Sequence, residues 1–355
     1  FQAQDQSYHY KQKTNGSHTL SYYTSDRGWN QYYYAGVDCS AYTGWIVYNV
    51  TNIDSNTVVN NEEGFVGSST KQARRFGETE GWGTWTHDTA AVAAAGELKV
   101  GDIVSMSGHV WVVLGVCDDG SVVFMHSTPS DSRDGYAGGG IQIASLNPAG
   151  QDQTDCEAYK LADYYMSKYY PQWYERYAIS QKGYDYYLET KSNSNAGIFH
   201  WDLSGKALLS DPEGYAKMSP AEILADIFND TTPLTLTYPE GIAKDEVKIE
   251  VYKGFPTSSS STIEAMVKNG QLKEIPANED GTYTLTGPGT YSYHISGEGY
   301  YNILKLFNLT VDDIVSGGKT MELTGGKLGT GEGKFDDGFQ PTAKPSQAPD
   351  TYVMD

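Results

Sequence analysis

The period of the hydrophobic pattern changes along this chain, and that change limits the folds it can adopt. Apolar positions within Cys39–Val50 recur at the spacing of one buried helix face. Residues 103–126 contain three short strand-like runs separated by turn residues. After residue 231 the chain alternates with period two for about ninety residues. The pattern predicts a mixed helix and strand domain over residues 1–231, followed by an all-β domain over residues 232–324, expected to be a small sandwich.

Two segments with unusual composition complete the expected organisation. Residues 155–231 begin with a dense run of tyrosines and are expected to form a helical extension of the first domain, interrupted at Pro171. Residues 325–355 are rich in glycine and then proline and lack apolar periodicity. They are predicted to be a linker to a further part of the protein.

Charge and hydropathy exclude several classes of protein. The net charge is −20 and the isoelectric point is about 4.6, which argues against nucleic-acid binding because phosphate recognition needs a basic face. No apolar run is long enough for a membrane span, and the mean hydropathy is −0.51. An acidic, polar chain is expected to be extracellular, with a signal peptide already removed before Phe1.

The cysteines are too few for a disulfide framework. The chain has three, Cys39, Cys117 and Cys156, and none lies at a spacing typical of metal ligands. If Cys39 is a nucleophile, Cys117 and Cys156 either pair or stay reduced. We therefore expect no metal site.

Cys39 follows a strong helix-starting residue. Asp38 is a favourable N-cap, so Cys39 is expected in the first turn of the helix. Free backbone N–H groups and the positive end of the helix dipole would stabilise a thiolate there and lower its pKa. The alternative is that Cys39 is a small buried apolar residue, which is the usual state of a free cysteine.

Two histidines on neighbouring strands favour the catalytic interpretation. His109 begins one predicted strand and His126 ends the next. If the strands form a hairpin with an even-length loop, the two side chains lie on the same face, whereas an odd-length loop or a bulge would separate them. One imidazole could then accept the thiol proton while the other fixes its orientation.

Four short motifs, in this order, resemble the NlpC-type papain-like peptidases of bacterial cell walls. The motifs are Asp38-Cys39-Ser40, Gly101-Asp102-Ile103-Val104, Gly108-His109-Val110 and Met125-His126-Ser127. The resemblance implies an α+β papain-like catalytic domain, in which the helix bearing the cysteine packs on a small antiparallel sheet. It covers roughly residues 30–130.

The resemblance also implies roles for particular residues. Cys39 would be the nucleophile, His109 the general base and then acid, and His126 the orienting residue. Such enzymes cleave amide bonds in peptidoglycan stem peptides, often next to D-glutamate, without a cofactor. Ser40, Trp111 and Tyr34 are the expected substrate-binding residues.

Some positions differ from the pattern of these peptidases. Ala41 replaces the usual glycine, and Trp111 replaces a small residue and could reshape the substrate groove. Tyr32 and Tyr33 compete with Tyr34 for the tyrosine that precedes the cysteine.

The β domain and the reaction type leave alternatives open. Residues 232–324 resemble the prealbumin-like and Ig-like modules of bacterial surface proteins and are expected to act as a spacer or binding module. The tyrosine-rich segment 155–188 is either core or a surface for stacking on wall glycans. The chain could also be an amidase or acyltransferase of the same fold, or a non-catalytic surface-binding or adhesion protein. The oligomeric state is left open.

Overall fold

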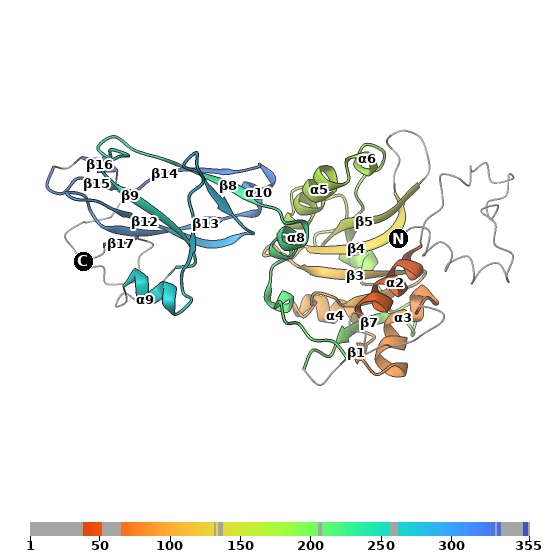
Figure 1. Ribbon diagram of the computed structural model, residues 1–355. Coiled ribbons are helices and arrows are strands. Elements are labelled where there is room, and N and C mark those ends of the chain that lie inside the picture. The colour runs from red at the N-terminus through yellow and green to blue at the C-terminus, as the bar shows by residue number, and fades with distance from the viewer. Residues whose placement is uncertain are drawn as a thin grey trace. The chain divides into compact units, whose positions relative to one another are not determined.

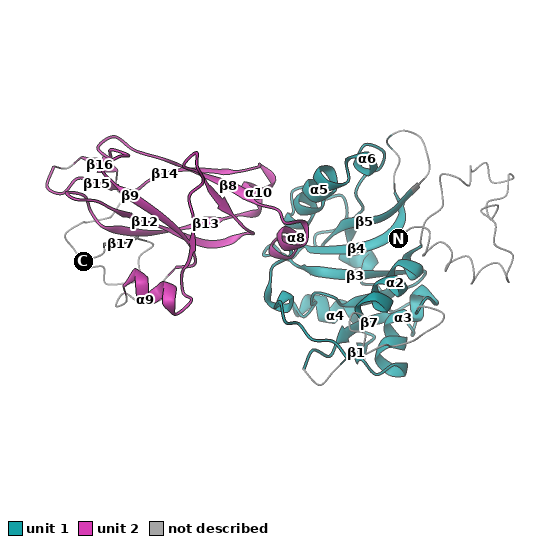
Figure 2. Ribbon diagram, viewed as in Figure 1, with its two compact units in different colours: residues 1–220 teal, residues 221–355 magenta. Residues whose placement is uncertain are grey.

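The computed structural model divides the chain into two compact units. Unit 1 spans Phe1–Pro220 and unit 2 spans Ala221–Asp355 (Figure 2). The structure describes residues 38–51, 65–130, 133, 138–204, 208–255, 262–330, 332–334 and 351–353. The division falls slightly before the domain boundary expected from the sequence after residue 231.

Unit 1 is built on a seven-stranded sheet with the order β1-β7-β2-β3-β4-β5-β6. Figure 1 labels β1, β7, β3, β4 and β5 of this sheet. Neighbouring strands are antiparallel except β5 and β6, which are parallel. The strands are β1 (Gly83–Thr86), β2 (Ile103–Met106), β3 (His109–Val116), β4 (Val122–Ser130), β5 (Gly138–Asn147), β6 (Gln181–Gly183) and β7 (Gly197–Trp201). The three strands expected within residues 103–126 are confirmed as β2, β3 and β4.

The helices of unit 1 are mostly short. They are α2 (Cys39–Thr51), α3 (Gln72–Arg74), α4 (Thr89–Ala94), α5 (Glu157–Tyr169), α6 (Pro171–Tyr174) and α7 (Tyr184–Tyr187), with a π turn at Arg75–Thr79 and 3-10 turns at Ser69–Lys71 and Tyr215–Lys217. The helix predicted to begin at Cys39 is confirmed, as are helices on both sides of the residue before Pro171. Within the described residues, no helix combines the length and apolar character needed to span a bilayer.

The strands of unit 1 bury apolar side chains on both faces. Alternation along β3 sends Trp111 and Val113 to one core and Val110 and Val112 to the other. The first core also contains Tyr187 from α7. The second contains Val47 from α2. A sheet covered on both faces explains why its central strands read as nearly continuous apolar runs.

Unit 2 is mainly β. Its sheets have the orders β10-β9-β12-β13-β17, β11-β8-β14 and β15-β16, and β8 pairs with β14 in parallel. The strands are β8 (Thr232–Thr237), β9 (Lys248–Lys253), β10 (Lys273–Ile275), β11 (Tyr283–Leu285), β12 (Gly289–Ser296), β13 (Ile303–Leu309), β14 (Lys319–Glu322), β15 (Gly325–Gly326), β16 (Gly333–Lys334) and β17 (Thr351–Val353). The helices are α8 (Pro220–Phe228), which begins at the unit boundary, α9 (Ile263–Lys268) and α10 (Val311–Val315). Three of the short strands lie in the segment predicted to be a linker, 325–355.

The fold class expected from the sequence is wrong. We expected an α+β papain-like domain, with the cysteine-bearing helix on a small antiparallel sheet, followed by a β-sandwich. The structure is instead mostly β, with a curled seven-stranded sheet and several smaller sheets. The sequence pattern indicates only β2, β3 and β4 of this sheet. Strands β1 and β7 are short and pair with each other over more than a hundred residues of chain, so the pairing that stabilises them has no local signal.

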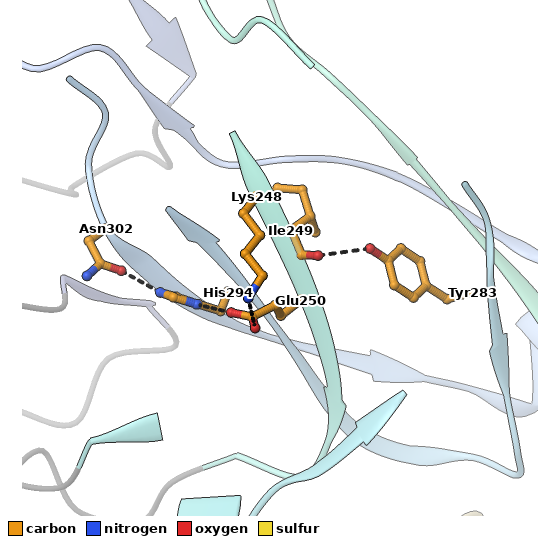
Figure 3. Close-up of polar contacts among 6 residues, drawn as sticks. All are labelled: Lys248, Ile249, Glu250, Tyr283, His294 and Asn302. Carbon is orange, nitrogen blue, oxygen red and sulfur yellow. Dashed lines mark hydrogen bonds and ion pairs between the residues drawn. The ribbon is translucent and has the colours of Figure 1, made fainter. Parts of the chain in front are cut away.

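One polar network in unit 2 predicts a pH-dependent stability (Figure 3). Oε2 of Glu250 lies 2.9 Å from Nδ1 of His294, whose Nε2 lies 2.5 Å from Oδ1 of Asn302. Nζ of Lys248 lies 2.5 Å from Oε1 of Glu250. Burial alone would raise the pKa of Glu250, but the hydrogen bonds from Lys248 and His294 lower it overall.

A carboxyl group whose pKa is lower in the folded than in the unfolded state stabilises the fold at pH values above its unfolded-state pKa. This stabilisation is lost as the pH falls through the folded-state pKa. We therefore expect unit 2 to lose stability below about pH 4.3, the ordinary glutamate pKa, and Glu250→Gln to flatten that dependence. Calorimetry of the whole chain measures this. All seven tryptophans precede residue 202, so tryptophan fluorescence identifies the unit 1 transition. Glu298→Gln, at an exposed position, is the control, and equal pH dependence in both variants would contradict the prediction.

Candidate active site

Cys39 is the first residue of helix α2, and Asp38 caps that helix. Oδ1 of Asp38 accepts hydrogen bonds from the Ala41 N–H and the Ser40 hydroxyl, both at 2.9 Å. The carboxylate thereby satisfies a backbone donor that the helix leaves unpaired. The N-cap predicted from the sequence is confirmed, and it fixes the direction in which Cys39 leaves the helix.

The Cys39 thiol is half-buried and surrounded by backbone donors. The backbone N–H groups of Val110, Ser40 and Cys39 itself point toward the sulfur and act to lower its pKa, which favours the thiolate. Burial and the negative charge of Asp38 act more strongly in the opposite direction, so the pKa of Cys39 is raised overall. We expected the helix terminus to lower this pKa. Burial reverses the sign, and the resting thiol is neutral near pH 7.

His109 and His126 contact each other across strands β3 and β4. Nε2 of His109 lies 2.9 Å from Nδ1 of His126, and the ring centroids are 5.1 Å apart. At this distance one imidazole donates a hydrogen bond and the other accepts it. His126 is fully buried, whereas His109 is half-buried at the start of β3. The pair leaves Nδ1 of His109 as the nitrogen that can accept a thiol proton.

The contact between the histidines depends on two irregularities that cancel. The connection between β3 and β4 is 117–121, which is an odd number of residues and alone would place the two rings on opposite faces. A bulge between Val113 and Gly115 adds one residue on β3. Beyond the bulge Val112 faces Met125, and the two histidines return to the same face.

Both imidazoles are neutral over the physiological pH range. Burial lowers the pKa of His109 to about 4, the charge of Lys182 acts in the same direction, and Asp38 opposes them. Burial, followed by the charges of His109 and Lys182, holds the pKa of His126 well below its usual range. A neutral His126 is suited to accept a hydrogen bond from a His109 that becomes charged.

The tautomer of this pair determines whether His109 is a base. Nδ1 of His109 is free to accept a proton only if its Nε2 carries one and donates it to His126. Nε2 of His126 then carries the second proton, and this buried atom has no hydrogen-bond partner among the described residues. The Phe124 ring lies 4.8 Å from the His126 ring at 74°, a T-shaped contact in which a ring N–H can point at an aromatic face.

Tyr187 is a site residue that the sequence analysis missed. Its ring centroid lies 5.7 Å from that of His109 and 6.2 Å from that of His126. Burial raises the pKa of Tyr187, and Tyr186 and Cys39 act in the same direction. The residue lies on the short helix α7, within the tyrosine-rich segment. No local pattern separates it there from the neighbouring tyrosines.

Cys39 and His109 both lie near the start of β3 but are associated with opposite faces of the sheet. Alternation places His109 on one face of the strand, while Cys39 packs beside Val110 in the core of the other face. In the part of the chain that the structure describes, no hydrogen bond joins the sulfur to the imidazole. A proton transfer between them would require the two side chains to move closer than they lie in this structure.

The expected substrate-binding residues have different surroundings. Ser40 is buried, and its hydroxyl is bound to Asp38. Trp111 is 0 % exposed and packs in the core, so its side chain offers no surface to a substrate. Tyr34 lies outside the described residues.

Asp102, from the motif that precedes β2, has a structural environment. Oδ1 of Asp102 lies 2.8 Å from Nδ1 of His200, and Oδ2 accepts the Lys99 N–H at 2.6 Å. Asp102 is 1 % exposed. Its contacts with Lys99 and with His200 of β7 hold the turn before β2 against β7. Burial raises the pKa of this carboxyl despite these partners.

Among the residues that the structure describes, one cluster outside the histidine pair has metal-ligand atoms close together. The Cys117 sulfur and carboxylate oxygens of Asp119 and Glu157 lie within 4.8 Å of one another. Asp119 already accepts the Glu157 N–H at 2.8 Å, and Glu157 accepts the Asp118 N–H at 3.1 Å. These bonds join the turn after β3 to the start of α5 and explain the cluster without a metal ion. Cys117 and Cys156 are both free thiols.

Comparisons with known proteins found no match for this chain. No protein-family model matches it, and no curated protein and no solved structure is significantly similar to it.

Proposed function

We propose that this protein is an exported cysteine peptidase that hydrolyses amide bonds in peptidoglycan stem peptides. The observation that carries the chemistry is the His109–His126 hydrogen bond, which leaves Nδ1 of His109 without a part in it, at the start of the strand whose next residue, Val110, presents its N–H to the Cys39 thiol. The peptidoglycan substrate is supported by the motif resemblance to NlpC-type peptidases. An extracellular or cell-wall location is part of the same proposal.

The proposed reaction follows acyl-transfer chemistry. His109 takes the thiol proton at Nδ1, and the Cys39 sulfur attacks the amide carbon. The backbone N–H groups of Cys39 and Ser40 at the start of α2 are suited to bind the developing oxyanion. The His109 proton passes to the leaving amine, which departs and leaves a thioester. Water then hydrolyses the thioester, with His109 again as the base.

Burial of the histidine pair defines the part played by His126. When His109 becomes an imidazolium, its Nε2–H donates a charge-assisted hydrogen bond to Nδ1 of His126. His126 remains neutral because burial disfavours its charged form. In this proposal His126 positions His109 and stabilises its charge without exchanging a proton with substrate.

Cys39→Ala tests the nucleophile directly. We expect wild-type protein to cleave purified muropeptides and the variant to show no turnover above background, because no other atom at this position can form the thioester. Mass spectrometry of the products distinguishes an endopeptidase from an amidase or acyltransferase. The near-isosteric Cys39→Ser variant controls for packing. Full turnover by Cys39→Ala would exclude Cys39 as the nucleophile.

The raised pKa of Cys39 favours a second candidate, a non-catalytic protein that binds wall peptides at the cell surface. That candidate predicts muropeptide binding without cleavage and slow alkylation of Cys39 by iodoacetamide near neutral pH. Rapid alkylation together with cleavage would exclude it.

A further inference from the structure

Lys182 lies on the same face of the sheet as the histidine pair. Strand β6 pairs in parallel with β5, and Leu146 faces Lys182. Leu146 belongs to the core that contains Trp111 and Phe124. Paired residues point to the same face, so the Lys182 side chain leaves β6 toward the histidines.

The Lys182 side chain contacts the aromatic residue that covers the two histidines. Its Nζ lies 5.6 Å from the Tyr187 ring centroid, within the range of a cation–π contact. Lys182 is half-buried, and no carboxylate among the described residues pairs with it. A partly desolvated ammonium without a counter-ion is stabilised when an anion binds beside it.

Lys182 brings a positive charge close to the histidine pair of a strongly acidic protein. The positive charge of Lys182 lowers the pKa of both His109 and His126, after the larger effect of burial. Asp38, the N-cap of helix α2, acts on the pKa of His109 in the opposite direction. Because the whole chain carries a net charge of −20, an anionic ligand is repelled at long range and needs a local cation to bind.

We propose that Lys182 binds a carboxylate of the substrate beside Tyr187, and so selects peptides that carry a free carboxylate near the scissile amide. The inference takes the peptide substrate from the proposed function. The preference for an anion rests on the position of Lys182 alone. Lys182 is a specificity residue in this scheme and exchanges no proton with the reacting groups.

Alkylation of Cys39 tests the anion preference without requiring hydrolysis. The thiolate displaces iodide from both iodoacetate and iodoacetamide and takes up a carboxymethyl or a carbamoylmethyl group, but only iodoacetate carries a negative charge. We expect Lys182→Met to lower the ratio of the iodoacetate to the iodoacetamide rate at Cys39 by about fivefold, the scale of a partly exposed ion pair. Lys182→Arg should keep the ratio. Peptide mass spectrometry separates Cys39 from Cys117 and Cys156.

Lys217→Met is the matched control, because Lys217 is an exposed lysine of the same unit. It should leave the ratio unchanged. An equal ratio in wild type and Lys182→Met would overturn the proposal for Lys182, whether or not the protein is a peptidase.

Hydrolysis of a matched peptide pair supplies the second measurement. One peptide carries a free carboxylate and the other the corresponding carboxamide. We expect Lys182→Met to raise KM about fivefold for the carboxylate peptide and to leave the carboxamide peptide unchanged. No cleavage of either peptide by wild type would refute the proposed peptidase, while the alkylation ratio would still decide the anion site. Equal effects on both peptides would refute the selectivity.

Discussion

His109→Gln is expected to lower kcat for muropeptide hydrolysis by about a thousandfold, within the range of a lost general base. Glutamine can keep a hydrogen bond toward Nδ1 of His126, but it cannot accept the thiol proton. The Cys39 pKa is already raised, so without this base the reactive thiolate is scarce near pH 7. Glutamine is similar to histidine in size and polarity, so the stability of the fold should change little.

Steady-state kinetics and a pH profile check this expectation. In wild type, protonation of free His109 should remove activity as pH falls through about 4, so the acidic limb of kcat/KM should lie well below the usual histidine value. His200→Gln is the matched control, since His200 is a half-buried histidine of unit 1 bound to Asp102. It should leave kcat near wild type. A His109→Gln variant with wild-type kcat would remove His109 from the mechanism.

Trp111→Ala is expected to lower the free energy of unfolding of unit 1 by about 3–5 kcal/mol, typical of a fully buried tryptophan. Its ring lies 4.9 Å from the Phe124 ring and 6.1 Å from the Tyr187 ring, and the residue is 0 % exposed. Deletion would leave a cavity below the two histidines and let Tyr187 move. Activity should therefore fall with stability.

Urea unfolding followed by the remaining tryptophans measures this loss in unit 1. Trp111→Phe retains an aromatic ring and should cost less than half as much. A loss below about 1 kcal/mol in Trp111→Ala would show that this residue is not packed as described, and would restore the expectation that it lines the substrate groove.

Elements with strong local signals could be predicted from the sequence. The helix at Cys39 has an N-cap and a helical apolar face, and the strands near His109 are bounded by glycine turns. Strand β7 has five residues, pairs with β1 and β2, and lies inside the segment assigned to a helical extension. Its partners are about a hundred residues away, so the pairing that stabilises it has no local signature.

The candidate site was predictable only in part for a similar reason. Cys39, His109 and His126 are rare residue types at informative positions, and the sequence pointed to them directly. Tyr187 and Lys182 reach the same place through the fold of β6 and α7, among many similar tyrosines and lysines. The sign of the Cys39 pKa shift also depends on tertiary burial, which outweighs the helix terminus and is not encoded in the tripeptide around it.

The bulge at Gly115 has a consequence for length variation in this protein. The φ of Gly115 is 148°, and a Cβ there would lie 3.1 Å from Pro220. The bulge therefore ends at a position that favours glycine. Removing the bulge alone, or shortening the 117–121 turn alone, would turn one imidazole to the other side of the sheet. Removing both together would restore the pair. Insertions and deletions in this hairpin are therefore tolerated only in compensating pairs, and a designed or natural homologue should vary both lengths or neither.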